Sequence, residues 1–138
     1  MKNYELIEHT ADIRIRVKAG DLKGLFADTA WAMFDIIAQR SADSVQRSEK
    51  IKIKVPGADR EELFINWLNE LLSLSSAKEL IFSNFQITKL KKNGLEATAT
   101  GESMQNYKVN TEVKAATYHQ LKIEETPAGW QAEVIFDV

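Results

Sequence analysis

Carboxylates near the two ends of the chain are the side chains best suited to chemistry. Asp137 is followed only by Val138, so a side-chain carboxylate and the terminal carboxylate lie within one residue of each other. Like charges at this spacing repel. A hard cation held by oxygen atoms, such as Ca²⁺ or Mg²⁺, would relieve the repulsion, whereas a frayed and solvated chain end would need no ion. The spacing alone leaves both interpretations open.

Asp12 is the second candidate ligand. The residues after it alternate between apolar and basic over 13–18, which is typical of a half-buried strand and places Asp12 on its polar face. A solvated turn residue would give the same pattern. The first long strand and the last one, over 130–138, bring Asp12 and Asp137 to one cation only if they are neighbours in a sheet. The termini of single domains often lie close together, so this arrangement is a reasonable hypothesis.

The sequence predicts no catalytic residue. His9 and His119 are the two histidines, and cysteine is absent, so there is no thiol nucleophile and too few ligands for a catalytic zinc. No Gly-x-Ser-x-Gly elbow occurs, and the glycines match neither the dinucleotide nor the Walker spacing. A small hydrolase built around His9 or His119 is therefore the weakest of the functional hypotheses.

The segment Lys114-Ala-Ala-Thr-Tyr118-His119 combines a cation, an aromatic ring and an imidazole with small residues. It can be an ordinary strand in which Tyr118 is half-buried. It can also be a surface through which the protein contacts a partner, since no nucleophile or cofactor motif accompanies it. The spacing does not choose between the two.

The composition is that of one globular domain spanning residues 1–138. It is 44% hydrophobic and 28% charged, with a net charge of -2, so the basic footprint of a dedicated nucleic-acid binder is missing. The sequence shows no signal peptide and no apolar run long enough to span a membrane. We therefore expect a cytoplasmic protein with no membrane partner and only indirect contact with RNA. No pattern indicates an oligomeric state.

Helical and extended patterns divide the chain into an early helical part and a late β-rich part. Asp21 can cap a helix that reaches Ile37, and Asp59 and Glu62 have the spacing of a capping box at the start of a second helix. Extended segments and turns account for most of the rest: 50–55, 81–91, a turn at 92–94, 95–102, 109–125, a turn at 127–129, and 130–138. This order predicts an α+β domain with a mostly antiparallel sheet and two main helices covering one face.

Several sequence blocks, taken in order, resemble one known family along essentially the whole chain. They are Glu8-His9-Thr10-Ala11-Asp12-Ile13, Leu25-Phe26, Trp67-Leu68-Asn69-Glu70-Leu71-Leu72, Gly101-Glu102, Val113-Lys114-Ala115-Ala116-Thr117-Tyr118-His119 and Val134-Ile135-Phe136-Asp137-Val138. The family is archease. The resemblance implies an archease-like single domain that is not itself an enzyme. It implies an accessory factor that promotes guanylylation and multiple turnover of an RtcB-type GTP-dependent RNA ligase, in tRNA splicing or RNA repair.

The resemblance also implies roles for particular residues. It assigns a metal site to Asp12, Asp137 and an oxygen of Val138, with calcium as the usual ion. Lys114, Tyr118, His119 and His9 become candidates for transient contact with the ligase. One departure is that Asn106-Tyr107 stands where archeases often have a histidine, so a contact made by that histidine is not expected here. A general chaperone-like or adaptor protein for other partners is the alternative function.

Overall fold

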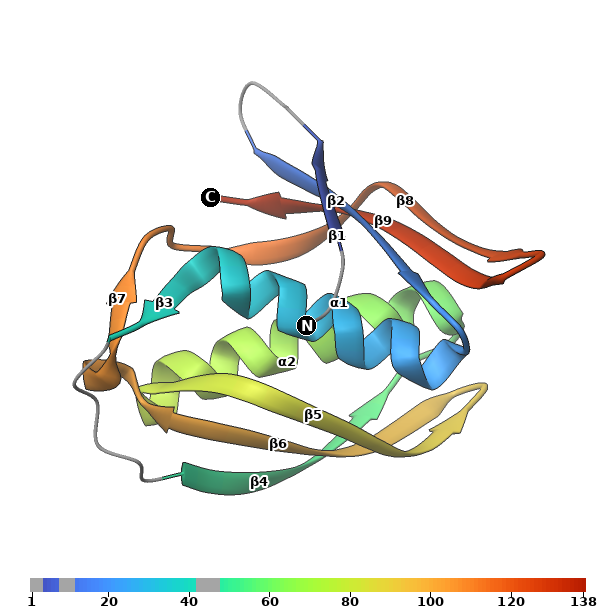
Figure 1. The fold of residues 1–138 in the computed structure, drawn as a ribbon. Helices are drawn as coiled ribbons and strands as arrows, with labels where there is room; N and C mark the ends of the chain where they lie inside the picture. Colours follow the sequence, from blue (N-terminus) through green and yellow to red (C-terminus); the bar gives the residue numbers. More distant parts are fainter. Residues whose placement is uncertain (1–3, 8–11, 42–47) are drawn as a thin grey trace.

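Two α-helices form the middle layer of the fold, with antiparallel sheets on both sides of them (Figure 1). The computed structural model describes residues 4–7, 12–41 and 48–138. The helices are α1 (Leu22–Ile37) and α2 (Arg60–Lys78). The strands are β1 (Tyr4–Ile7), β2 (Ile13–Ala19), β3 (Ala38–Arg40), β4 (Ser48–Pro56), β5 (Leu80–Lys91), β6 (Gly94–Ser103), β7 (Tyr107–Val109), β8 (Ala115–Thr126) and β9 (Gly129–Asp137), and a 3₁₀ turn, η1, covers Met104–Asn106.

The strands form three sheets. A four-stranded sheet has the order β1-β2-β9-β8, a three-stranded sheet has the order β4-β6-β5, and β3 pairs with β7. Every pair is antiparallel. The predicted α+β class with two main helices and mostly antiparallel strands is confirmed.

The division of the strands between both sides of the helices follows from the wide apolar surface of α1. The buried residues of α1 are Leu25, Phe26, Thr29, Ala30, Ala32, Met33, Phe34 and Ile37. A helix that is apolar over most of its circumference needs cover on more than one side. The four-stranded sheet contacts α1 through β2 and β9, and the three-stranded sheet contacts it through β5. The sequence pattern had indicated helices on one face of a single sheet, and α1 instead has sheets on two sides.

Both predicted helix starts are confirmed by their caps. The Asp21 carboxylate accepts a hydrogen bond from the Gly24 N–H at 2.7 Å, and the Asp59 carboxylate accepts one from Glu62 at 2.8 Å. The Glu62 carboxylate in turn accepts from the N–H of Ala58 at 3.0 Å, one residue before the usual capping-box position. These bonds satisfy backbone donors that the helices cannot pair internally.

Two connections differ from the sequence prediction. The β5–β6 turn consists of Lys92 and Asn93, and Gly94 already pairs in β6. This register keeps the buried residues Leu95 and Ala97 on the helix side of the sheet, and a slip of one residue would expose them. The extended run predicted over 109–125 is interrupted, because β7 ends at 109 and β8 begins at 115. In the part of the chain that the structure describes, no helix is long and apolar enough to cross a membrane.

Candidate functional site

The first and last long strands are neighbours, as the cation hypothesis requires. β2 and β9 pair in antiparallel fashion, and Ile13 lies opposite Phe136. Asp12 and Asp137 are the next residues outward on these two strands, at the same end of the four-stranded sheet. Adjacent strands are roughly 4.8 Å apart, so the two backbones are close enough for both carboxylates to reach one ion. Asp12 is partly buried and Asp137 is exposed.

β8 brings Lys114 to the same end of the sheet. The backbone N–H of Lys114 donates a hydrogen bond of 2.8 Å to the carbonyl oxygen of Asp137, and Ala115 pairs with Asp137. The Lys114 side chain is exposed, and Val138 is 43% exposed. Figure 1 shows the end of the chain beyond β9, beside β2. Four of the predicted site residues therefore lie together at one end of the four-stranded sheet: Asp12, Asp137, Val138 and Lys114.

Tyr118 and His119 lie elsewhere, on a bulge of β8. Thr117 pairs with Ile135 and Lys122 pairs with Glu133, so residues 118–121 face a single residue of β9. Tyr118 is 55% exposed and His119 is exposed, so both side chains are accessible from solvent at this irregular part of the strand. The bulge begins three residues from the Asp137 position, roughly 10 Å along the strand. His9 lies outside the described residues.

The environment of Tyr118 is acidic. Desolvation raises the pKa of the Tyr118 phenol, and the negative charges of Glu62 and Asp59 raise it further. Both carboxylates belong to the start of α2, so the bulge lies near that end of the helix. At neutral pH the Tyr118 hydroxyl is therefore a neutral hydrogen-bond donor and acceptor on an exposed aromatic ring.

Sequence reasoning missed the role of Asn69, which fixes the start of β8, next to Lys114. The Asn69 side chain accepts a hydrogen bond of 2.8 Å from the N–H of Ala116 and donates one of 3.2 Å to the carbonyl of Ala116. β8 is an edge strand of its sheet, so these backbone groups have no neighbouring strand. A polar asparagine that is partly buried beside the apolar face of α2 was the available signal, but its partner could not be read from the sequence.

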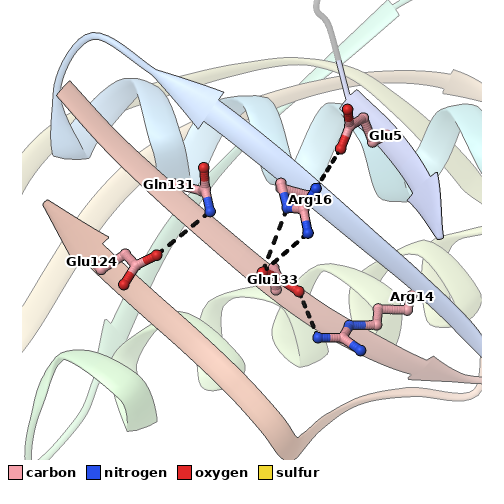
Figure 2. A network of polar contacts seen from close by, with 6 residues as sticks. All are labelled: Glu5, Arg14, Arg16, Glu124, Gln131 and Glu133. Atoms are coloured by element: carbon pink, nitrogen blue, oxygen red, sulfur yellow. Dashed lines mark hydrogen bonds and ion pairs between the residues drawn. The ribbon is translucent and has the colours of Figure 1, made fainter. Parts of the chain in front are cut away.

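Sequence reasoning also missed a charged network on the outer face of the four-stranded sheet (Figure 2). Glu133 is only 6% exposed. It accepts a hydrogen bond of 2.5 Å from Arg14 and longer ones of 3.5 Å from Arg16. Arg16 also binds Glu5 at 2.7 Å. Arg14 and Arg16 fall on the basic face of the strand predicted over 13–18, but only the pairing of β2 with β9 brings them beside Glu133.

The network keeps Glu133 charged. Burial by itself would raise the pKa of Glu133, but the hydrogen bond from Arg14 and the positive charges of Arg16 and Arg14 lower it below its ordinary value. A buried carboxylate that is paired in this way is stable as an anion at neutral pH.

The carboxylates at the sheet end have the donor chemistry of a hard cation site. Asp12 and Asp137 offer oxygen ligands, which suit Ca²⁺ and Mg²⁺, and no thiolate or imidazole of the described residues joins them there. Within residues 4–7, 12–41 and 48–138, no three His, Cys, Asp or Glu side chains form a metal-binding group. A cation would therefore need further oxygen ligands, such as one from Val138 and water.

Comparisons with known proteins identify the family. Residues 4–138 match the model of the Archease protein family (MTH1598/TM1083). Protein archease of Methanosarcina acetivorans is 35% identical, with 99% of this chain and 97% of that protein covered. Protein archease of Pyrococcus abyssi is 38% identical, with both chains covered completely. This chain belongs to the archease family.

Solved structures of relatives have the same fold. The solution structure of protein 1598 from Methanobacterium thermoautotrophicum matches with a TM-score of 0.76 at 30% identity, and each chain is covered completely. The crystal structure of an archease from Thermotoga maritima, named a possible chaperone, matches with a TM-score of 0.63 at 25% identity over 96% of this chain and 94% of that one. The archease-like fold predicted from the sequence is confirmed.

Proposed function

We propose that this protein is a cation-binding accessory factor that activates an RtcB-type GTP-dependent RNA ligase in the cytoplasm. It promotes guanylylation of the ligase and multiple turnover, and so supports tRNA splicing or RNA repair. The observation that supports this most is the register of β2 and β9, which puts Asp12 and Asp137 at one end of a sheet. These are the two carboxylates to which the family resemblance assigns a metal.

Each residue of the sheet end has a distinct part in the proposal. Asp12 and Asp137, with an oxygen of Val138, hold the cation, and a bound Ca²⁺ or Mg²⁺ supplies a divalent positive charge that attracts carboxylate or phosphate oxygens. Lys114, directly before β8, adds a positive charge that contacts acidic groups of the ligase. Asn69 fixes the position of that strand through Ala116.

Activation requires that the protein bind one state of the ligase more tightly than another, because equal binding would shift no equilibrium. Multiple turnover requires that the contact be transient. The proposal gives this chain no catalytic residue, in keeping with a sequence that has no cysteine and no glycine-rich phosphate loop. RNA is contacted by the ligase and only indirectly by this protein.

A ligation time course tests the proposal. An RtcB-type ligase is incubated with GTP and an excess of broken RNA, with and without this protein. We expect the ligase alone to stop near one turnover and the mixture to continue. The protein alone should neither join RNA nor become labelled by GTP. An unchanged time course, or self-labelling of the protein, would rule the proposal out.

A general chaperone is the second candidate function. The Thermotoga maritima relative is named a possible chaperone, and this chain exposes the apolar side chains of Leu6 and Val109. A chaperone would suppress the heat aggregation of unrelated proteins at equimolar amounts. An accessory factor specific to the ligase would leave that aggregation unchanged, so light scattering with an unrelated client separates the two.

A further inference from the structure

Arg14 occupies a position between two acidic sites on the outer face of the four-stranded sheet. It pairs with Ile135 of β9. Glu133 lies two residues from Ile135 in one direction, and Asp137 lies two residues from it in the other, so all three point to the same face. Diagonal neighbours across a strand pair are roughly 7 to 8 Å apart at the backbone, which a long side chain can reach. Arg14 can therefore extend toward Glu133 or toward Asp137.

The structure shows Arg14 directed to Glu133 (Figure 2). Its terminal nitrogen Nη2 lies 2.5 Å from the Glu133 carboxylate. Its Nε–H is buried and has no hydrogen-bond partner among the described residues. A guanidinium carries five N–H donors, so Arg14 retains the capacity to bind a second carboxylate.

Glu133 has a second cationic neighbour besides Arg14. Arg16 lies directly opposite Glu133 and contacts its carboxylate at 3.5 Å, while Glu5 holds Arg16 from the other side at 2.7 Å. The Glu133 carboxylate therefore keeps a cationic neighbour when Arg14 leaves it, and Arg14 is the member of the network that can reach the cation site. That site lies at the end of the sheet where Asp12 and Asp137 meet.

We infer that Glu133 sets the cation affinity of the Asp12–Asp137 end by holding Arg14 away from it. This inference rests on the proposed cation site. Arg14 is a positive charge attached to the protein, and it competes with a free divalent cation for the same two carboxylates. By binding Arg14, Glu133 keeps it from competing with the cation. Glu133 is thus a positioning residue for the site, although it supplies no ligand.

The inference predicts that substitutions of Glu133 and of Arg14 change the calcium affinity in opposite directions. In Glu133→Gln, Arg14 loses its ionic partner and turns to Asp12 and Asp137, so calcium affinity falls. In Arg14→Gln the competing charge is removed, so calcium affinity rises. A unit charge about 7 Å from a divalent ion, in surroundings close to water, changes its affinity by roughly five- to tenfold. The double variant should bind at least as tightly as wild type, because Arg14 is no longer present to be released.

Calorimetric titration with CaCl₂ at low ionic strength measures these affinities, since salt would screen the effect. Arg16→Gln is the matched control, because it makes the same charge change on the same face two residues further from Asp137, and it should shift affinity less than twofold. The rise in melting temperature on adding about 1 mM CaCl₂ is a second readout, and it should rank the variants in the same order as their calcium affinities. Equal affinities for wild type, Glu133→Gln and Arg14→Gln would overturn the inference, and so would tighter binding by Glu133→Gln.

A metal-free crystal structure of Glu133→Gln separates this inference from the proposed function. If wild type binds no calcium, the proposed cation site fails, and the structure of the variant still decides where Arg14 goes. We expect its guanidinium within hydrogen-bond distance of Asp12 or Asp137. An Arg14 side chain that stays beside residue 133 would contradict the inference. The Arg14→Gln titration remains informative if Glu133→Gln does not fold.

Discussion

Asn69 and Ala116 exchange two hydrogen bonds, although they lie 47 residues apart on a helix and a strand. The side-chain amide of Asn69 pairs with both backbone groups of Ala116, as a neighbouring strand would. This closes part of the open edge of the four-stranded sheet. It also fixes the backbone two residues after Lys114, whose N–H binds the Asp137 carbonyl. The proposed cation site therefore depends on α2 for its alignment.

Asn69→Ala should lower the free energy of unfolding by about 2 kcal/mol, because Ala116 is buried and both of its backbone groups would lose their partner. Urea denaturation measures the change. Asn66→Ala is the control, since Asn66 lies one turn earlier and makes a single exposed bond to the Pro56 carbonyl. The free energy of unfolding of Asn66→Ala should fall by under about 1 kcal/mol. Equal losses for the two variants would show that the Ala116 pairing has no special importance.

Thr29→Val should stabilise the protein. Thr29 is fully buried in α1, and its hydroxyl has no hydrogen-bond partner among the described residues. Replacing the hydroxyl by a methyl group of similar size removes an unpaired polar group, which is worth about 1 kcal/mol or more. Thr29→Ser keeps the hydroxyl and loses the methyl group, so it should destabilise by about 1 kcal/mol. Thermal denaturation of both variants checks this, and a less stable Thr29→Val would contradict it.

Glu133→Gln should reduce stability in a pH-dependent way. The pKa of Glu133 in the folded protein is below its ordinary value of 4.5, so the unfolded state takes up the proton first as the pH falls. The stabilisation from ionised Glu133 is therefore complete above pH 4.5 and is lost as the pH falls through the lower folded value. At pH 7 we expect a loss of roughly 2 kcal/mol, because Arg14 and Arg16 lose their buried partner.

Urea denaturation from about pH 7 down to about pH 3, where carboxylates titrate, measures the difference in free energy of unfolding between wild type and Glu133→Gln. The curves of wild type and Glu133→Gln should converge at the acidic end. Glu124→Gln is the control, because Glu124 is exposed and its contact with Gln131 is long, at 3.5 Å. A difference between wild type and Glu133→Gln that grows toward acidic pH would have the wrong sign for this account.

Local features of the fold were predictable from the sequence. The caps of Asp21 and Asp59 depend on residues within one helical turn, so they could be recognised without tertiary information. The inward phase of β2 was also correct, with Ile15 and Val17 buried. In each case the pattern and its physical cause lie within a few consecutive residues.

Features that depend on strand order were not predictable in the same way. The closeness of Asp12 and Asp137 requires that β2 and β9 be neighbours, which no local pattern specifies. The same pairing buries Glu133. The wide bulge of β8 around Tyr118 likewise results from register against β9. The candidate site could be nominated from sequence, but its surroundings needed the sheet topology.

The two proposed roles at the sheet end should differ in the shape of an activation curve. Charge reversal in Lys114→Glu removes a contact with the ligase, so it should weaken association and shift the midpoint to higher protein concentration. A high enough concentration should then restore full activation. Asp12→Asn and Asp137→Asn remove a cation ligand, so they should lower the maximum. Asp137→Asn should change stability by under about 0.5 kcal/mol, since Asp137 is exposed.

The most direct test is the initial rate of ligase guanylylation by labelled GTP, titrated with wild-type protein and with Asp137→Asn in the presence of Ca²⁺ or Mg²⁺. Asp137→Asn leaves intact the backbone carbonyl that accepts the Lys114 bond, so it alters the carboxylate charge alone. We expect the wild type to raise the rate to a plateau. The folded variant should reach a much lower plateau, which added protein does not restore. A folded Asp137→Asn protein that reaches the wild-type plateau would contradict a role for the carboxylate pair in activation.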